Sequence, residues 1–444
     1  MLEGVANASR IPELRRRLLF TAAMLAIYRL GVAVPTPGID GQALANFFDR
    51  MSSTLFGWVN LFSGGGLQHF SVFALGIMPY ISVAIILDLM KIGWPYLDEL
   101  YKEGEAGRRK ISQYTRYGTV ALSLLQGGFI AYGLEKAPAE GGGSFVYHPG
   151  PAFITMTVIT LTAGTIFVMW IGEQITERGV GNGISLIIMA GIIARLPSAL
   201  GTTATYLREG EMSIFVLILI VVVVIVVTAG IVYVETGQRR IPISYARRVV
   251  GRKVYGGQTT HLPLKINTSG VIPPIFASSL LVMPATVAGF VPGLRFLTNY
   301  LNPGSVIYNL VYVALIVFFA YFYTAVTFNP VDVADNLKKQ GGFVPGIRPG
   351  RFTADYIDRV LSRITLGGAI YVSAVCVLPT LLIQRFNVPF YFGGTALLIV
   401  VGVALDTTAQ IQTHLIARNY AGFMRRGPRG GGGGGSRKGR AALG

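Results

Sequence analysis

Long apolar runs recur along the whole chain and are separated by shorter polar connections. A helix needs about 20 mostly apolar residues to cross a bilayer core, and such runs occur ten times. Helices are predicted because lipid offers no partner for open backbone groups, and because each run is about twice as long as a barrel strand. The predicted spans are 18–35, 73–93, 115–134, 152–173, 183–200, 213–234, 269–292, 304–328, 364–384 and 389–408.

The ten spans divide into two groups of five at the loop formed by residues 201–212. An odd number of spans in each group inverts the second group relative to the first, as in an inverted repeat. The second span of each group carries Gly-x-x-Pro followed shortly by Ile, in residues 76–81 and 270–275. Residues 1–200 are therefore predicted to form the N-terminal half, and residues 201–424 the C-terminal half, of an all-α membrane protein.

Two segments stand outside this pattern. Residues 56–73 are largely apolar, but a run of small residues at 63–66 leaves the apolar part too short to span. A re-entrant, cavity-lining piece and an interfacial helix at the outer surface both fit such a segment. Residues 425–444 are Gly-rich and basic, a composition that predicts disorder.

Composition excludes a soluble enzyme, because only 13% of the residues are charged while 52% are hydrophobic. Soluble domains carry about 25% charged residues. The net charge of +17 belongs to one side of the predicted bundle, where 31 of the 38 Lys and Arg residues lie in the termini and in alternate loops. Cytoplasmic loops of membrane proteins carry the excess of Lys and Arg, so both termini are predicted to be cytoplasmic.

The sequence carries no catalytic constellation. The four histidines are far apart, Walker A and nucleophile-elbow motifs are missing, and Cys376 is the single cysteine. The chain is therefore predicted to be no enzyme and to hold no cofactor or metal. Two charges lie inside predicted spans, where charge is costly. A structural role is favoured for Arg29, whereas Asp88 is expected to face a neighbouring helix or a wet cavity, with a proton or ion site left open.

Two loops on the predicted cytoplasmic side, residues 235–268 and 329–363, are long, basic and shaped by Pro and Gly. Basic runs on the inner face often only orient the protein or contact lipid headgroups. These two loops exceed what orientation needs, which favours docking of a large anionic partner.

Nine longer stretches identify the family that the chain resembles. They are Leu61–Gly65 (LFSGG), Phe73–Ser82 (FALGIMPYIS), Gly107–Gly118 (GRRKISQYTRYG), Gly172–Ser185 (GEQITERGVGNGIS), Gln238–Ile241 (QRRI), Thr260–Lys265 (THLPLK), Asn336–Lys339 (NLKK), Phe343–Gly350 (FVPGIRPG) and Pro389–Thr395 (PFYFGGT). Through them the chain closely resembles the SecY family, the channel subunits of bacterial protein translocases, to about residue 424.

The resemblance implies a two-half channel for unfolded polypeptide, with an hourglass pore closed midway by a ring of apolar side chains. Carried onto matching positions, the ring is Ile77, Ile81, Ile184, Ile188, Ile275 and Ile399. A narrow apolar ring dewets and limits ion leak around a passing chain. Residues 57–72, with Phe62, Ser63, Gly64 and Gly65, correspond to the family's plug, which lies outside the ring.

A lateral gate between the second and third spans and the seventh and eighth spans is also implied. Signal peptides and nascent membrane helices leave through it into membrane lipid. Its polar cluster corresponds to Asp88, Gln126 and Asn267. Asp88 departs from the family, which usually has glutamine there, and a carboxylate changes the cost of gate opening according to its protonation.

The partners of the family are implied by the same transfer. Arg252, Lys253 and Arg348 correspond to contacts with the ribosome or the motor ATPase SecA, and the small subunits SecE and SecG flank the channel in the bacterial cytoplasmic (inner) membrane. The alternative is a secondary transporter of a small solute, with Asp88 as its ion site. The basic loops and the ring, which offers no ligand, disfavour that alternative, and a membrane protease lacks its nucleophile–base pair.

Overall fold

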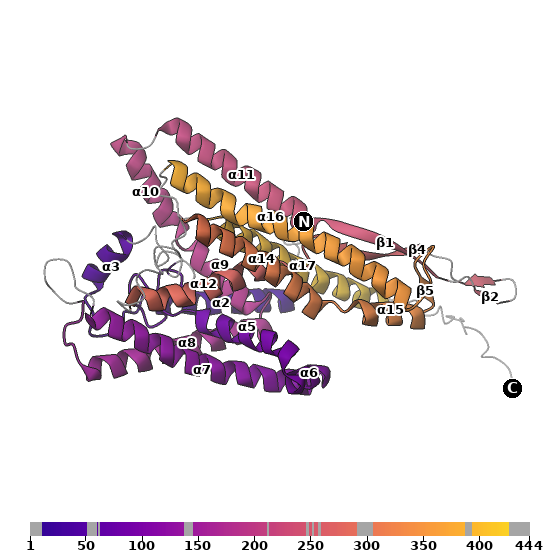
Figure 1. Ribbon diagram of the computed structural model, residues 1–444, viewed down its shortest axis with the longest axis horizontal. Coiled ribbons are helices and arrows are strands. Elements are labelled where there is room, and N and C mark those ends of the chain that lie inside the picture. The colour runs from indigo at the N-terminus through magenta and orange to yellow at the C-terminus, as the bar shows by residue number, and fades with distance from the viewer. Residues whose placement is uncertain are drawn as a thin grey trace, which may run out of the picture.

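The chain forms a bundle of long helices with a small β-sheet that projects from one end (Figure 1). The computed structural model describes residues 11–50, 60, 63–136, 145–210, 213–245, 248–250, 253–255, 259–290, 305–386 and 393–425. The helices are α2 (Pro12–Val32), α3 (Gly41–Arg50), α5 (Met78–Gly93), α6 (Pro95–Lys102), α7 (Glu105–Lys136), α8 (Pro151–Arg178), α9 (Gly183–Ile193), α10 (Leu196–Glu209), α11 (Ile214–Thr236), α12 (Ile272–Phe290), α14 (Val306–Thr327), α15 (Pro330–Lys339), α16 (Arg351–Phe386) and α17 (Gly394–Arg425). The strands are β1 (Gln238–Tyr245), β2 (Arg248–Val250), β3 (Lys253–Tyr255), β4 (Thr259–Lys265) and β5 (Gly342–Phe343).

The predicted helical membrane fold is confirmed, since each of the ten predicted spans falls on a helix. Six helical stretches in the described part of the chain, with α9–α10 and α14–α15 each counted as one, are long and apolar enough to cross a membrane, and the pair α5–α6, bent by 100°, is a seventh if it counts as one span. The apolar character of α2 is diluted by an arginine cluster, Arg15-Arg16-Arg17, and by Arg29. The described apolar stretch of α12, Ile272–Leu281, is shorter than a full span.

The second span of each predicted half begins with the same local structure. Gly76 and Gly270 have φ angles of 57° and 61°, a left-handed conformation that glycine adopts without strain. A proline follows in the first turn of α5 and of α12, where its missing N–H costs no helical hydrogen bond. The same Gly-x-x-Pro pattern therefore gives the same backbone conformation at the N-termini of α5 and α12.

The fifth predicted span, residues 183–200, is two helices instead of one. The helix α9 ends at Ile193, and α10 begins at Leu196 with Pro197 in its first turn. A continuous helix would need Pro197 to donate an N–H to the carbonyl of Ile193, four residues earlier, and proline has none. The chain therefore restarts a helix at this point.

The two predicted halves meet where α12 packs against α5 and α7, and where α17 packs against α9. In Figure 1, α3 and α10 lie at the end of the bundle opposite the sheet, while α6 and α15 lie at the same end as the sheet. Three of the connections that the charge pattern assigns to one face, those that contain α6, the sheet and α15, thus lie at one end of the molecule.

The sheet is made by the two basic loops, 235–268 and 329–363, and was not predicted from the sequence. The strand β1 pairs antiparallel with β4 on one edge and with β5 on the other. Its alternate residues Ile241 and Ile243 are buried and pack with Leu337 of α15 and with the start of α16. Both loops therefore form one unit, the sheet body, which consists of β1, β4, β5, α15 and the first turns of α16.

Candidate functional site

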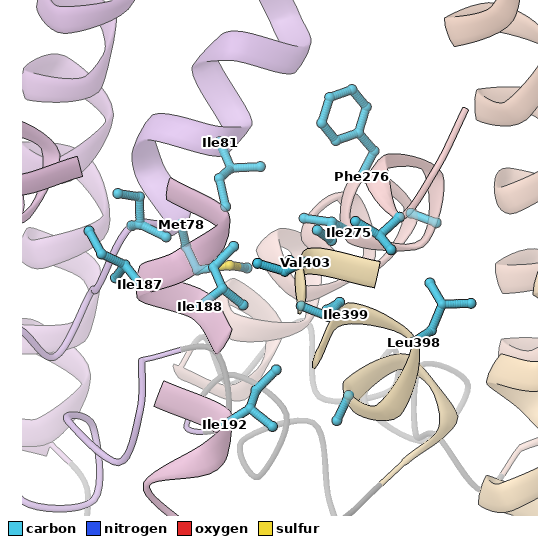
Figure 2. Close-up of a cluster of buried hydrophobic side chains, with 14 of the residues drawn as sticks. Met78, Ile81, Ile187, Ile188, Ile192, Ile275, Phe276, Leu398, Ile399 and Val403 are labelled. Atoms are coloured by element: carbon cyan, nitrogen blue, oxygen red, sulfur yellow. The ribbon is translucent and has the colours of Figure 1, made fainter. Parts of the chain in front are cut away.

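An apolar cluster fills the space between the two predicted halves, and all six isoleucines of the predicted ring belong to it. Five of them, Ile77, Ile81, Ile188, Ile275 and Ile399, are buried, and Ile184 is half-buried. They come from α5 and the residue before it, from α9, from α12 and from α17. Figure 2 shows Ile81, Ile188, Ile275 and Ile399 converging from different helices. Side chains without hydrogen-bonding groups thus close the centre of the molecule.

Local sequence positions the ring residues of α9. Ile184 and Ile188 are four residues apart and therefore share one face of the helix. Asn182 caps this helix, because its Oδ1 accepts a hydrogen bond from the backbone N–H of Ile184 at 3.1 Å. Glycine is required at position 183, since a Cβ on Gly183 would lie 2.0 Å from the carbonyl oxygen of Gly172 in α8. The close approach of α8 and α9 fixes the direction of the ring face.

Two residues that the resemblance did not assign lie in the same cluster, Met78 and Val403 (Figure 2). Val403 follows Ile399 by four residues on α17, so helical spacing alone points to it. Met78 receives a hydrogen bond at 3.9 Å on its sulfur from the Oγ of Ser279 in α12. This buried contact joins α5 of one predicted half to α12 of the other.

The plug segment, which we define as the described residues 63–72, consists mainly of turns and is mostly buried. A Cβ on its Gly64 would lie 3.0 Å from the Cα of Gly191 in α9. Gly191 follows Ile188 by three residues, so the plug segment lies about one helical turn beyond the ring. An interfacial surface helix does not describe these residues. Of the predicted plug residues, Ser63, Gly64 and Gly65 are described and Phe62 lies outside the described residues.

Two of the three residues of the predicted gate cluster, Asp88 and Asn267, have separate hydrogen-bond partners. Asp88 accepts a hydrogen bond from Tyr101 Oη at 2.7 Å, across the bend between α5 and α6. Asn267 donates from Nδ2 to Glu235 Oε1 at 2.6 Å, at the end of α11. Gln126 is half-buried on α7 and has no hydrogen-bond partner among the described residues. Asp88 and Asn267 are thus each paired within their own half, and a shared cluster stays a prediction.

Of the predicted docking residues, Arg348 and Lys253 are described. Arg348 is exposed in the loop between β5 and α16, and its backbone carbonyl accepts a hydrogen bond from Thr353 Oγ1 at 2.9 Å. Lys253 lies in β3, which pairs with β2, and Arg252 lies outside the described residues. Other exposed cations on the sheet body are Arg239, Arg240, Lys265, Lys338, Lys339 and Arg351.

Within the described ranges, no three His, Cys, Asp or Glu side chains come together as a metal site. Cys376 is buried in the apolar cluster on α16. The geometry of the site is accordingly one of apolar contacts between helices.

Comparison with known proteins agrees with this geometry. The model of the SecY family matches residues 71–408. The protein translocase subunit SecY of Escherichia coli strain K12 is 51% identical over 420 residues, which cover 93% of this chain and 94% of that relative. A solved structure described as a protein-conducting channel has a TM-score of 0.65 at 16% identity and covers 93% of this chain and 97% of its own.

A second solved structure, Sec61 in the canine ribosome–channel complex from the endoplasmic reticulum, has a TM-score of 0.61 at 16% identity, with 93% of this chain and 97% of the other covered. At such low identity the two structures establish the likeness of the fold. The family follows from the sequence matches, which extend over nearly the full length: the chain belongs to the SecY family.

Proposed function

We propose that the chain is the channel subunit through which unfolded polypeptides cross a membrane. The observation that carries this proposal is the closure between the two halves: six isoleucines from four parts of the chain lie in one apolar cluster, and the plug segment lies beyond Ile188. Apolar side chains at a constriction exclude water and ions. They also offer no directional bond that would retain one particular side chain, which suits a substrate of varied sequence.

The boundary where α12 meets α5 and α7 is proposed as the lateral gate, through which signal peptides and nascent membrane helices reach lipid. The hydrogen bond from Ser279 to Met78 crosses this boundary. A thioether sulfur is a weak acceptor, so this bond opposes separation only slightly. Contacts of this kind let the two halves part and close again.

The sheet body is proposed as the docking surface for SecA and the ribosome, on the cytoplasmic side of a bacterial inner membrane. We propose that both termini lie on that side and that SecE and SecG lie beside the helices. Support comes from the exposed cations of the sheet body, of which Lys265 is paired, at 3.9 Å from Asp406. A further support is that the fold likeness includes Sec61 in a ribosome–channel complex.

The small-solute alternative is not favoured by the geometry. The ring side chains carry no ligand atoms, and the carboxylate of Asp88 is engaged by Tyr101. A carrier for a small solute needs convergent polar groups to hold its cargo.

Reconstitution tests the channel function. The chain is assembled with SecE and SecG in lipid vesicles and supplied with SecA, ATP and a precursor that bears a signal peptide. We expect the precursor to become protected from external protease only when ATP is present. Vesicles without the chain and a precursor without its signal peptide are the controls. Absence of protected precursor from the complete mixture would overturn the proposal.

Docking is tested separately by Arg348→Glu. Reversal of a charge at a contact site costs about tenfold or more in binding, so SecA-driven translocation should fall by at least that factor while assembly is unchanged. Arg208→Glu is the matched control, because Arg208 is exposed on α10 at the opposite end of the bundle. Undiminished translocation by the Arg348 variant would remove this residue from the docking surface.

A further inference from the structure

Arg29 is a charged side chain on a predicted membrane span, and the proposed function leaves it unassigned. It lies in the last turn of α2. Its Nη1 donates a hydrogen bond of 2.7 Å to the backbone carbonyl of Gly64 in the plug segment. Hydrogen bonds with an ionised donor are shorter and about twice as strong as neutral ones. A charge in a membrane span is costly unless it is paired, and the hydrogen bond to this carbonyl offsets that cost for Arg29.

Gly64 is shaped to receive this bond. Its φ of 66° lies in the left-handed region that favours glycine. A Cβ on Gly64 would lie 2.9 Å from Tyr28 Oη and 3.0 Å from the Cα of Gly191. Tyr28 Oη also donates to the carbonyl of Ser63 at 3.4 Å. Two consecutive carbonyls of the plug segment therefore face two consecutive side chains of α2.

A second arginine holds the middle of the plug segment. Arg195, between α9 and α10, donates from Nη2 to Gln68 Oε1 at 3.3 Å. The backbone N–H of Gln68 in turn donates to Asn60 Oδ1 at 3.0 Å. Arg29 approaches the plug segment from α2 and Arg195 from the break between α9 and α10, and both belong to the predicted N-terminal half.

We propose that Arg29 is the positioning residue that holds the plug closed beyond the ring, with Arg195 as a secondary tie; this inference rests on the proposed channel function. Arg29 acts through the carbonyl of Gly64. Loss of the guanidinium leaves the plug segment held by Tyr28, Arg195 and apolar contacts. Lysine keeps the charge but lacks the planar array of donors, so it restores the tie only in part.

The test measures exposure of the plug segment by thiol labelling. Ser63 and the native Cys376 are each 1% exposed, so a Ser63→Cys variant reports plug opening against a low background. In channels assembled with SecE and SecG, we expect Arg29→Gln to raise the labelling rate at position 63 by about tenfold, as fits the loss of one charge-assisted hydrogen bond. Arg29→Lys should give an intermediate rate. Resting ion conductance should rise in the same order.

The matched control is Arg208→Gln, which removes an exposed arginine that makes no hydrogen bond to the plug segment. An unchanged labelling rate in an assembled Arg29→Gln channel overturns the proposal. If that variant does not assemble, Arg29→Lys and Arg195→Gln carry the same test, and wild-type rates in both overturn it. ATP-driven translocation by the unmodified channel is measured in parallel. Its absence contradicts the channel function, whereas unchanged labelling contradicts only the role of Arg29.

Discussion

Each isoleucine of the ring fills space with branched carbons and brings no hydrogen-bonding group, so the closed centre is held by dispersion and by exclusion of water. The same property makes the closure sensitive to volume. Interiors are packed at the density of organic crystals, and loss of a few methyl groups leaves a gap that nearby side chains fill only in part.

Triple replacement of Ile188, Ile275 and Ile399 by alanine is expected to raise the ion conductance of the resting channel. Planar-bilayer recordings without substrate measure this leak. Each change also costs about 2–5 kcal/mol of stability, so assembled channels must be purified before recording. The same three changes to leucine keep the volume and should leave the resting conductance low. Equal leak in the alanine and leucine variants would contradict the ring as a seal.

A second expectation at this scale concerns the tether between Asp88 and Tyr101. Tyr101→Phe removes the donor and should destabilise the α5–α6 corner by about 1.5–3 kcal/mol, the range for a hydrogen bond to a charged group. Asp88→Asn keeps an acceptor oxygen and should cost less. Thermal unfolding is followed by tryptophan fluorescence in a Trp58→Phe/Trp170→Phe background, in which Trp94, between the two helices, is the reporter. A lower stability of Asp88→Asn than of Tyr101→Phe would show that the hydrogen bond to Tyr101 is not the main contribution of Asp88.

The sequence marked Arg29 and Asp88 as exceptional but did not reveal their partners. The partner of Arg29 is a backbone carbonyl 35 residues later, and the partner of Asp88 lies across a 100° bend. Both depend on the path of the chain through turns, which no local pattern encodes. Hydropathy identifies a charged residue within a predicted span, but it does not identify the hydrogen-bond partner that offsets the cost of that charge.

At the scale of elements, the helical spans were predicted correctly, because the thickness of the lipid bilayer sets the length of an apolar helix. Apolar length decides where a helix crosses, so all ten spans fell on helices. The sheet was not predicted because the alternation of polar and apolar residues that is typical of a strand covers only Arg240-Ile241-Pro242-Ile243. In addition, one of the strands that pair with β1, β5, comes from a separate loop. Pairing between distant segments is invisible to a pattern read one window at a time.

The sheet body is expected to unfold separately from the helix bundle when its buried face is made polar. Ile243→Asn places an amide at a position that is 4% exposed and should cost about 1–3 kcal/mol for the unsatisfied group. Hydrogen exchange should quicken in β1 and β4 while α14 and α17 stay protected. Arg240→Asn, an exposed change on the same strand, is the control. Equal exchange in the two variants would mean that the sheet is not held by its packing on α15.

At the scale of the whole molecule, the proposed ring depends on four chain segments together. Local sequence shows that each segment is apolar but not which faces meet, so the six isoleucines were assigned through family resemblance. The structure brings them into one cluster and adds Met78 and Val403. Helical spacing from Ile399 reaches Val403, whereas Met78 is identified by its contact with α12.

A covalent link across the proposed gate should stop transport. In Met78→Cys/Ser279→Cys, one thiol replaces the Oγ of Ser279 and the other takes the place of the Cγ of Met78, one bond short of the sulfur that Ser279 contacts at 3.9 Å, and oxidation is expected to join α5 to α12. Translocation of a signal-bearing precursor should then fall to background and recover on reduction. The single variants, treated alike, should translocate normally. Full activity in the oxidised double variant would show that the two halves need not part.

The helix α9 carries Ile184 and Ile188 of the ring and, one turn further on, Gly191, against which Gly64 rests. The proposed ring and the plug segment both contact this one helix, so they lie in series along the pore but do not act independently. A displacement of α9 that is large enough to widen the ring also breaks the contact between Gly191 and Gly64. The channel then has one activation free energy instead of two, and single-channel recordings are expected to show a single conductance step without a half-open level.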